Sequence, residues 1–446
     1  MPRGYASLMS RRGGGLHQPP RPPVRWGRIA ILVVAALITA GVVYVLSSLG
    51  MAVSRSYTPV APEVAPEVRA ALVQPGERVN ILFMALDDQE VRTDVIILAS
   101  LDLEQKKAAA IQIPRDTRSF LAGEGTIEKI NHAYAYGVRD GDETFPPNLR
   151  TLKTVEGLLG VRIHYTVVVD MDAFTRAIDE IGGVEVDIPF VMDYDDPYQN
   201  LHIHFNPGRQ ILNGQQALEF VRWRHNNDGT GYPDQDLGRI RAQQQFIRTV
   251  LAQVTRPGNL VRLPSLVQVM AGYVESTIEP ARLASLAAMA ASIDVSGIEM
   301  VTLPGIDAML YDPKTDLRVS YFVHDPVETR QLVDRLVHGV DPKQAAQVQV
   351  EVAATPGDRR ASAVVNRLAE QGFQASLVLP PEELPSVVRV VPDGQGRERS
   401  LLVARSLMAQ GYPVEMVTEE DPETAGAVRV ILTPTQEEPA SADGIR

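Results

Sequence analysis

The chain has 446 residues, of which 45% are hydrophobic and 22% are charged, so it is long enough for more than one domain of about 100–200 residues. It contains no cysteine, which excludes disulfides and thiolate metal sites. The formal net charge of -12 argues against a nucleic-acid-binding protein, because such a protein needs a basic face. Any anionic ligand must therefore be held by a local cluster of cationic side chains.

An uncharged apolar segment, residues 29–49, follows a basic N-terminus that contains arginines and no acidic residue. Its length matches the roughly 20 residues that cross a bilayer. The positive-inside rule then predicts a cytoplasmic tail over residues 1–28, one transmembrane helix over 29–49, and an extracytoplasmic location for the rest. The alternative is a cleaved signal peptide, but its apolar core is typically only ~7–15 residues long, so the sequence favours an uncleaved anchor in the cell membrane.

Residues 50–78 are proline-rich and repeat Ala-Pro-Glu-Val, which predicts an extended extracytoplasmic stalk. The first folded domain is expected over residues 79–339. It opens with three short apolar runs, VNILFMAL, DVIILASL and KAAAIQI, which predict neighbouring buried strands. Helical patterns then interleave with two more strands, which predicts an α/β fold built as an α/β/α sandwich. The expected helices cover residues 149–159, 172–181, 214–220, 237–254, 260–274 and 281–293, and the expected strands cover 165–169 and 300–303.

Residues 346–433 show a second pattern of strand, helix, strand, strand, helix and strand. This order predicts a smaller α+β domain at the C-terminal end. The last residues, 434–446, are polar and are expected to form a disordered tail.

Charged side chains stand next to the ends of the first three predicted strands. Asp87 follows the first strand, Arg92 and Asp94 precede or begin the second, and Arg115 and Asp116 follow the third. Ligands of open α/β sheets bind outside the carboxyl ends of the strands, which is where Asp87 and Arg115 are expected. Further candidates downstream are Lys129 in EKINHAYAYG, Arg222 and Arg224 in FVRWRH, and Arg239 and Gln243 in GRIRAQQQF.

The spacing of the downstream residues predicts which of them share a face. If the segment FVRWRH is extended, Arg222 and Arg224 point to the same side because they are two residues apart. Arg239 and Gln243 are four residues apart and therefore lie on one face of a helix.

The chemistry of this set predicts a phosphate site. Guanidinium groups are planar forks that match phosphate oxygens, and several are needed to offset a pyrophosphate. Aspartates among them would repel an anion unless they hold a hard divalent cation, and Asp87 and Asp94 are the natural pair. Each residue alone has an ordinary interpretation, since a single arginine on a helix is usually part of a solvated face. The ordered set carries the prediction.

Eight stretches between residues 79 and 254 resemble, in order and spacing, the LytR-CpsA-Psr family of cell-wall glycopolymer transferases. Residues 346–433 look similar to the C-terminal domain often appended to these proteins, although the opening AATPGD departs from the usual pattern. The eight stretches are NILFMALDD, RTDVIILASLD, IQIPRDT, KINHAYAYG, TVEGLLG, IDEIGGVEVDIP, LNGQQALEFVRWR and GRIRAQQQF.

The resemblance implies a phosphotransferase that moves an anionic glycopolymer, such as teichoic acid, from a polyprenyl-pyrophosphate carrier to a peptidoglycan acceptor through a phosphodiester bond. It implies that Asp87 and Asp94 bind Mg²⁺ or Mn²⁺, and that Asp94 and Arg115 are catalytic. Asp94 is the first candidate for the general base and Asp116 the second. The pyrophosphate positions implied by the match are Arg92, Arg115, Lys129, Arg222, Arg224, Arg239 and Gln243.

Two departures from the family pattern affect the expected site. Ala85 stands where a glycine is usual, and an arginine common after the first aspartate is replaced by Gln89 or Glu90. Two alternative functions also remain open: a pyrophosphatase that hydrolyses the same lipid-linked substrate, and a non-catalytic wall-binding or regulatory membrane protein.

Two side chains near the site have competing interpretations. His202 and His204 alternate in LHIHF as on a strand and are interpreted as structural, because the sequence shows no third metal ligand nearby. Trp223 stands between the arginines of FVRWRH and is interpreted as a packing residue rather than as a platform for a sugar ring.

Overall fold

The computed structural model of the chain describes most of the sequence after residue 77. The segments predicted as cytoplasmic tail, transmembrane helix and C-terminal tail lie outside the described residues, as do residues 50–77 of the predicted stalk, Asp87, residues 260–273 of one predicted helix and most of the helix expected over 281–293. The last residue of the predicted stalk, Arg78, and the last residue of the helix predicted over 260–274, Val274, each begin a strand instead. Among the helices that are described, none has the length and apolar character needed to cross a membrane. The described residues are 78–86, 91–141, 145–197, 201–233, 235–254, 274–279, 286, 293, 297–312, 316–381, 384–392, 397–417 and 426–433.

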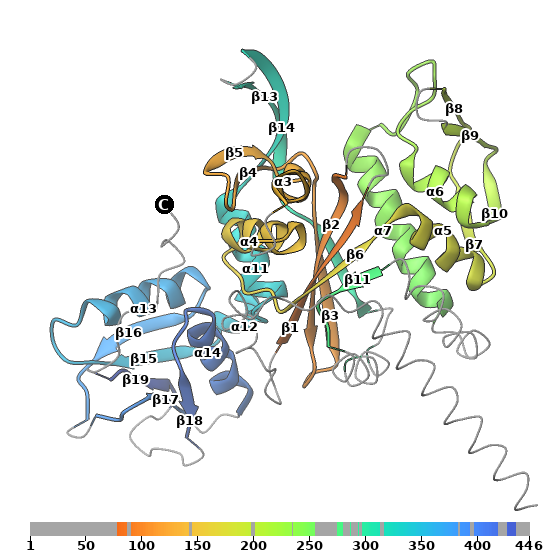
Figure 1. Cartoon of the computed structure of the whole chain (residues 1–446). Coiled ribbons are helices and arrows are strands. Elements are labelled where there is room, and N and C mark those ends of the chain that lie inside the picture. The colour runs from red at the N-terminus through yellow and green to blue at the C-terminus, as the bar shows by residue number, and fades with distance from the viewer. Residues whose placement is uncertain are drawn as a thin grey trace, which may run out of the picture. The chain divides into compact units, whose positions relative to one another are not determined.

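A six-stranded mixed sheet with the order β11-β6-β1-β2-β3-β12 forms the centre of the larger part of the fold (Figure 1). β1, β2 and β3 are antiparallel neighbours, while β6 runs parallel to β1 and β12 runs parallel to β3. This arrangement confirms that the three apolar runs at the start of the domain form adjacent strands. The strands are β1 (Arg78–Leu86), β2 (Thr93–Asp102), β3 (Lys107–Ile113), β6 (Tyr165–Val169), β11 (Val274–Ser276) and β12 (Glu299–Thr302).

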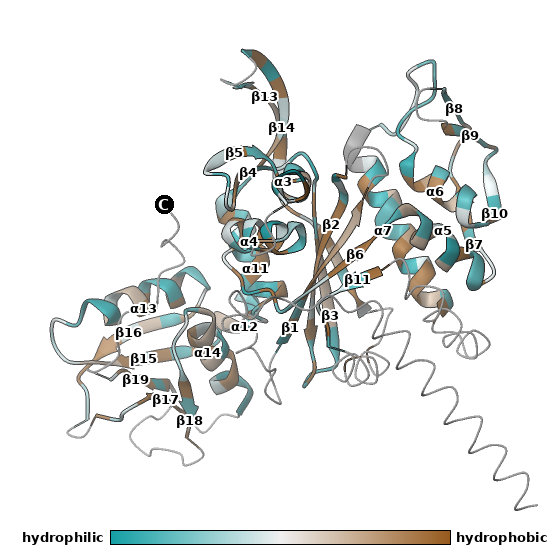
Figure 2. Cartoon of the chain, in the orientation of Figure 1, coloured by the Kyte–Doolittle hydropathy of each residue, from teal (hydrophilic) through white to brown (hydrophobic). Residues whose placement is uncertain are grey.

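Helices cover both faces of this sheet (Figure 1), which gives the expected α/β/α layers. Successive residues of a strand point to opposite faces, so Leu82 of β1 packs in a cluster with Leu152 of α4 and Val333 of α11. On the other face, Ile97 of β2 packs against Ile247 of α7. Figure 2 shows both hydrophobic and hydrophilic residues along α7, as expected for a helix with one buried side. The covering helices are α3 (His132–Asp140), α4 (Pro147–Leu159), α7 (Gln235–Val254) and α11 (Pro326–Leu336).

Two helices and two antiparallel strand pairs form a lobe beside α7 with its own hydrophobic cluster. Trp223 is 1% exposed in this cluster and packs against the rings of Phe190 and Tyr232 at centroid distances of 5.3 and 5.0 Å. The packing interpretation of Trp223 is therefore confirmed. The sequence analysis did not predict the strand pairs of this lobe. The elements are α5 (Met171–Glu180), α6 (Gly214–Arg222), the pair β7 (Val184–Ile188) and β10 (Gly208–Leu212), and the pair β8 (Met192–Asp196) and β9 (Leu201–Phe205).

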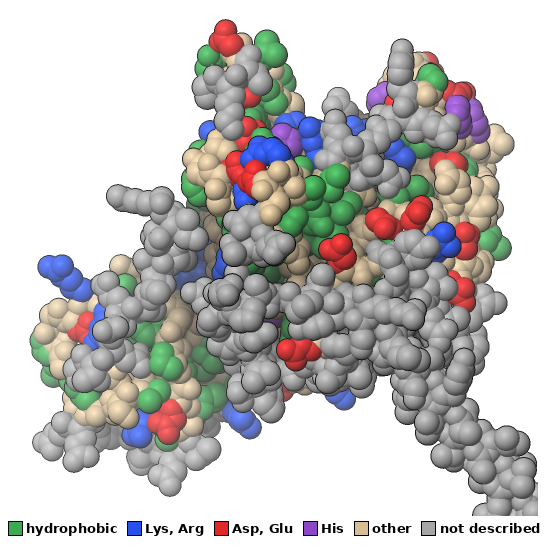
Figure 3. Space-filling model, in the orientation of Figure 1, with side chains coloured by type: hydrophobic (Ala, Val, Ile, Leu, Met, Phe, Trp, Pro, Cys, Tyr) green, Lys and Arg blue, Asp and Glu red, His purple; other side chains and the backbone are tan. Residues whose placement is uncertain are grey.

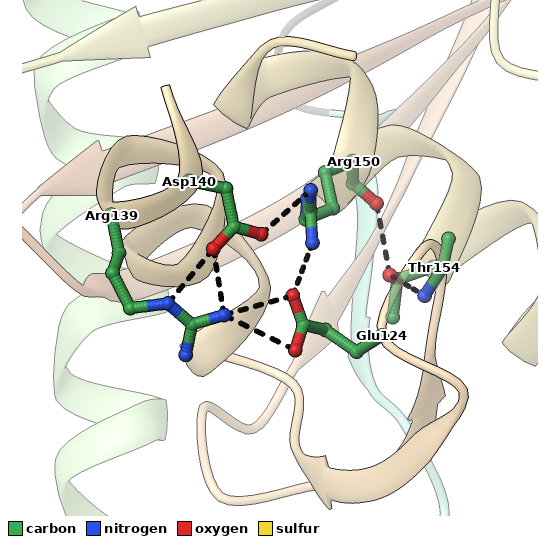
Figure 4. Close-up of polar contacts among 6 residues, drawn as sticks. Glu124, Arg139, Asp140, Arg150 and Thr154 are labelled. Atoms are coloured by element: carbon green, nitrogen blue, oxygen red, sulfur yellow. Dashed lines mark hydrogen bonds and ion pairs between the residues drawn. The ribbon is translucent and has the colours of Figure 1, made fainter. Parts of the chain in front are cut away.

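A buried arginine joins α4 to its neighbours (Figure 4). The Arg150 side chain is 4% exposed and forms ion pairs with Glu124 and with Asp140, the latter at 3.0 Å. The exposed Arg139 closes the ring by contacting the same two carboxylates at 3.2 and 2.8 Å. Thr154 adds a hydroxyl that accepts a hydrogen bond from the backbone N–H of Ala122 at 3.0 Å. These contacts fix α3, α4 and the β4–β5 hairpin together; β4 spans Arg118–Leu121 and β5 spans Thr126–Lys129.

One further hairpin projects beyond the sheet edge in Figure 1. It consists of β13 (Gly305–Asp312) and β14 (Leu317–His324), which pair antiparallel. Its base is attached to the rest of the fold, because the backbone N–H of Phe322 donates to the carbonyl of Asp116 at 2.9 Å.

Residues after Val340 form a second sheet with the order β16-β15-β19-β17-β18 and a second hydrophobic cluster. All six elements expected in this region are present, and the structure adds the short β18 and α12. Val337 belongs to the first cluster and Val340 to the second, and the domain limits stay predictions. The elements are α12 (Pro342–Ala345), β15 (Gln349–Ala353), α13 (Arg359–Glu370), β16 (Gln374–Val378), β17 (Val388–Val391), α14 (Arg397–Ala409), β18 (Val414–Met416) and β19 (Val428–Ile431).

Candidate functional site

A cavity of about 960 Å³ lies at one edge of the central sheet. β1 and β3 both run antiparallel to β2, so their carboxyl ends meet the start of β2 at this edge, where Leu86 pairs with Thr93. The carboxyl end of β6 arrives at the same place, since Val169 pairs with Ala85. Figure 3 shows Lys and Arg side chains on the surface between the β13–β14 hairpin and the β8–β9 hairpin. The topology thus gathers strand ends that are far apart in sequence.

Every predicted site residue that the structure describes lines this cavity. Asp87 lies outside the described residues, so its predicted role as a metal ligand stays a prediction. The residues brought together are Arg92, Asp94, Arg115, Lys129, Arg222, Arg224, Arg239 and Gln243.

Alternating acidic and basic side chains join the start of β2 to the ends of β3 and β5. The Nη1 of Arg115 donates to Oδ1 of Asp94 at 2.5 Å. The Nε of Arg115 is 3.9 Å from Oδ2 of Asp116, and Nζ of Lys129 is 2.9 Å from Oδ1 of Asp116. All four side chains are between 22% and 35% exposed, so they remain accessible to a ligand while their positions are fixed by one another.

Two arginines reach the cavity from the end of α6. Arg222 is the last residue of this helix, Trp223 is extended, and Arg224 follows. The extended segment in which the two arginines would share one side is therefore not present. Val221 and Arg222 still belong to the helix, and Val221 packs against the hydrophobic cluster of the lobe. The helix end and the turn after it nevertheless bring both arginines to the cavity.

The face of α7 that carries Arg239 and Gln243 points to the cavity, as their spacing predicts. Gln243 donates to the carbonyl of Val221 at 2.9 Å and accepts from Nε2 of Gln112 on β3 at 3.2 Å. Its amide is thus held between α6 and the sheet. Arg239 is only 7% exposed, so its charge faces the interior of the cavity rather than bulk solvent.

The balance of charges in the lining favours an anion together with a cation. The six lysine and arginine residues named above face five carboxylates in the lining, which leaves an excess of one positive charge. The negative charge of a pyrophosphate exceeds this excess. A divalent cation bound by some of the carboxylates would supply the missing positive charge. The five carboxylates belong to Asp94, Asp116, Glu128, Asp170 and Asp312.

A buried oxygen in the lining agrees with a hard cation. Asn131 is 4% exposed, and its Oδ1 has no hydrogen-bond partner among the described residues. Mg²⁺ and Mn²⁺ prefer carboxylate, carbonyl and water oxygens. Asp94, Asp116 and Asn131 all line the cavity and offer oxygens of this kind, so the chemistry of the lining fits such an ion.

Several lining residues were missed by the sequence analysis. His132 directly follows Asn131 in the quoted stretch KINHAYAYG, three residues after Lys129, and this position was a usable signal. Burial and the nearby Arg92 lower the pKa of His132, which keeps its imidazole neutral near pH 7. Tyr321 comes from β14, and Nζ of Lys129 lies 6.0 Å from its ring centroid. No local signal pointed to Tyr321, because the hairpin reaches the site only through the fold.

One wall of the cavity is apolar. Its side chains come from β2, β6, α5, β9 and α6, and three of them, Phe174, Leu201 and Val221, belong to or border the hydrophobic cluster of the lobe. The cavity therefore offers a charged side and an apolar side to the same ligand. The apolar lining includes Val95, Val169, Met171, Phe174, Leu201, Leu218 and Val221.

Comparison with known proteins gives consistent matches over this part of the chain. Residues 44–336 match the LytR_cpsA_psr family. The chain is 32% identical over 239 residues to the polyisoprenyl-teichoic acid–peptidoglycan teichoic acid transferase TagV of Bacillus subtilis, which covers 52% of this chain and 58% of TagV. It is 28% identical over 285 residues to the transferase TagU of Oceanobacillus iheyensis, covering 63% of this chain and 84% of TagU. The match to the crystal structure of B. subtilis TagV covers 59% of this chain and 98% of the TagV chain, with 28% identity and a TM-score of 0.48.

Proposed function

The chain belongs to the LytR_cpsA_psr family, and on that basis we propose that it is a phosphotransferase that attaches an anionic glycopolymer to peptidoglycan. The donor is a polyprenyl-pyrophosphate-linked glycopolymer, and the product is joined through a phosphodiester bond. TagV and TagU, which the chain resembles at 32% and 28% identity, are named as teichoic acid transferases acting on peptidoglycan. The alignment spans 58% of the length of TagV, so substrate and acceptor come to this chain as part of the proposal.

One observation carries the proposal: a single cavity places a cluster of guanidinium groups beside an apolar wall. A lipid pyrophosphate has the same two parts, a charged head and a hydrocarbon chain. The guanidinium groups of Arg92, Arg222 and Arg239 suit the phosphate oxygens as planar forks. Phe174 and Leu218 would contact the first isoprene units.

Transfer in such a site depends on positioning and on charge. The acceptor hydroxyl of peptidoglycan attacks the phosphorus that bears the glycan, and the bond from that phosphorus to the bridging oxygen breaks, which releases polyprenyl phosphate. Arg115, Lys129 and Arg224 stabilise the negative charge that develops on the phosphoryl oxygens. Arg115 also orients the Asp94 carboxylate through its 2.5 Å hydrogen bond.

The hydroxyl proton requires an acceptor in the cavity. Asp94 is the first candidate and Asp116 the second, because each carboxylate is held in place by a cation and lines the same space. Asp87 and Asp94 would hold Mg²⁺ or Mn²⁺, which supplies charge neutralisation on the pyrophosphate.

The proposed location follows from the N-terminal sequence. A helix over residues 29–49 would anchor the chain in the cell membrane with its N-terminus in the cytoplasm. The cavity would then lie on the outer side, where the isoprenoid end of the carrier is embedded in the same membrane and the peptidoglycan acceptor is within reach.

Product analysis tests this proposal against hydrolysis by the same site. The purified full chain in detergent is incubated with a polyprenyl-pyrophosphate oligosaccharide, Mg²⁺ and peptidoglycan fragments, and products are separated by mass. An oligosaccharide joined to the fragment through one phosphate supports the transferase. Lipid phosphate released with no joined product would replace it with a pyrophosphatase, and the absence of both turnover and binding would leave a wall-binding or regulatory protein.

A further inference from the structure

Four side chains with metal-binding chemistry lie together on the exposed face of the β8–β9 hairpin. The strands pair antiparallel with Asp193 opposite His204 and Asp195 opposite His202. The alternation of the strands sends the other residues, such as Met192 and Ile203, into the hydrophobic cluster of the lobe. The two aspartates and two histidines therefore form a compact square on the solvent side, here called the hairpin cluster.

The potential ligand atoms of the hairpin cluster lie within hydrogen-bonding distance of one another. The Nδ1 of His202 is 2.5 Å from Oδ1 of Asp195, and Nδ1 of His204 is 2.7 Å from Oδ1 of Asp193. The Nε2 of His204 is 3.5 Å from the same oxygen of Asp195. One ligand atom from each of Asp195, His202 and His204 can be chosen so that all three lie within 4.8 Å of one another.

Small side-chain rotations would complete the coordination. Ligands at about 2.0–2.2 Å from a tetrahedral zinc ion are separated from each other by roughly 3–3.5 Å. All four side chains are between 50% and 68% exposed, so no packed neighbour opposes such rotations. The ion would take the place of the proton shared by each histidine–aspartate pair.

We propose that the hairpin cluster binds one Zn²⁺ ion through Asp195, His202 and His204. Imidazole nitrogen selects zinc and its late transition-metal neighbours over Mg²⁺ and Ca²⁺, which prefer oxygen. Asp193 either supplies the fourth ligand or orients His204, the usual role of a carboxylate behind a metal-binding histidine. The sequence analysis interpreted His202 and His204 as structural because it found no third ligand nearby. That premise was wrong, since Asp195 on the partner strand lies within reach of both histidines.

The backbone under the hairpin cluster is held in place before any ion binds. Oδ1 of Asn226 accepts from the N–H of Asp193 at 2.6 Å, and Oδ1 of Asn227 accepts from the N–H of Asp195 at 2.7 Å. Asn226 is itself anchored, since it accepts a hydrogen bond from Nε1 of the buried Trp223 at 3.2 Å. The outer edge of β8 is thus fixed by a loop, which lowers the entropy lost when the ligands are ordered.

Because of the position of the hairpin, an ion bound to the hairpin cluster would affect the cavity. Tyr194 and Leu201, from the same two strands, line the 960 Å³ cavity. An ion that joins β8 to β9 would therefore stiffen one wall of that cavity. This zinc site is separate from the proposed Mg²⁺ site, and its existence does not depend on the transferase function.

Calorimetric titration tests the zinc site directly. The untagged full chain in detergent is treated with a chelator and dialysed into a buffer that contains millimolar Mg²⁺. It is then titrated with ZnCl₂. We expect one equivalent of Zn²⁺ to bind and to raise the unfolding temperature. His202→Ala combined with His204→Ala should weaken binding by at least about 100-fold, and Asp195→Asn by about 10-fold or more.

A matched control is Asp187→Asn, an exposed aspartate on β7 outside the hairpin cluster, which should bind zinc like the unaltered chain. Because the altered side chains are exposed, the metal-free variants should melt at the temperature of the metal-free chain. Zinc binding that is absent, that Mg²⁺ displaces, or that survives in the double histidine variant overturns the proposal.

Discussion

Arg115 and Asp94 meet through a 2.5 Å hydrogen bond from Nη1 to Oδ1, which joins the end of β3 to the start of β2 inside the cavity. The two residues are 21 positions apart in sequence but are brought together by the antiparallel register in which Ile96 pairs with Ile113. A charged hydrogen bond of this kind fixes both side chains at once. In the proposed transferase, it keeps a carboxylate and a guanidinium ready at the same phosphoryl group.

The first prediction concerns the charge of Asp94. Asp94→Asn keeps the size of the side chain but removes the carboxylate that would accept a proton and bind the divalent ion. We expect kcat to fall by about 100-fold or more, since loss of one well-placed electrostatic group typically costs that much. Steady-state rates at saturating Mg²⁺ measure the effect. A rate within threefold of the unaltered chain would remove Asp94 from the proposed mechanism.

The second prediction concerns the buried Arg150. Arg150→Met leaves Glu124 and Asp140 without their shared buried cation, and breaking a buried ion pair costs about 3–5 kcal/mol. Urea unfolding should show this loss in the free energy of unfolding. Arg139→Ala is the matched control, because the 56% exposed Arg139 contacts the same carboxylates from solvent, and its loss should lower the free energy of unfolding much less than the loss of Arg150. Equal losses in the two variants would contradict the role given to burial.

The third prediction compares two helical glycines. A Cβ at Gly214, the first residue of α6, would lie 2.1 Å from the carbonyl oxygen of Thr175 on α5, whereas a Cβ at Gly157 in α4 meets nothing within 4 Å. Gly214→Ala should therefore destabilise the fold by at least about 1–3 kcal/mol through a backbone clash. Gly157→Ala should stabilise it by about 0.5–1 kcal/mol, since alanine is the better helix former. Thermal unfolding of the pair decides whether α5 and α6 pack this closely.

The fourth prediction concerns the pH dependence of stability at His338, which follows α11. Burial, with the nearby charges of Arg367 and Arg78, lowers the pKa of His338 to about 4. The unfolded chain, with an ordinary histidine pKa near 6.5, takes up this proton first, so the free energy of unfolding falls as the pH drops from about 6.5 to 4. His338→Gln should reduce the slope over that window. Parallel unfolding curves at pH 7, 5.5 and 4 measure it, and an unchanged slope would show that His338 is protonated as easily in the folded chain.

Most of the central sheet could be predicted because its strands are short, predominantly apolar runs. VNILFMAL and DVIILASL have the composition of strands buried on both faces, and the structure places both inside the sheet. The charged residues at their ends were found for the same reason, since a polar residue directly after such a run lies at the sheet edge.

The hairpins could not be predicted in the same way. β8 reads MDYDD, which contains more acidic than apolar residues, and its strand character comes from pairing with β9 rather than from its own composition. The third ligand of the hairpin cluster was missed for this reason. Tyr321 reaches the cavity through a contact between β14 and residues about 200 positions earlier in the chain, for which the sequence gives no local signal.

Transfer in a single turnover tests the central claim most directly. The full chain, Arg115→Ala and the matched control Arg209→Ala, an arginine 76% exposed on β10 outside the cavity, are each mixed in excess with a labelled polyprenyl-pyrophosphate oligosaccharide, Mg²⁺ and peptidoglycan fragments. The account predicts that the full chain and Arg209→Ala join glycan to the fragment at the same rate, while Arg115→Ala is slower by at least about 100-fold. Equal transfer rates in all three proteins would contradict the assignment of this cavity as the site of phosphoryl transfer.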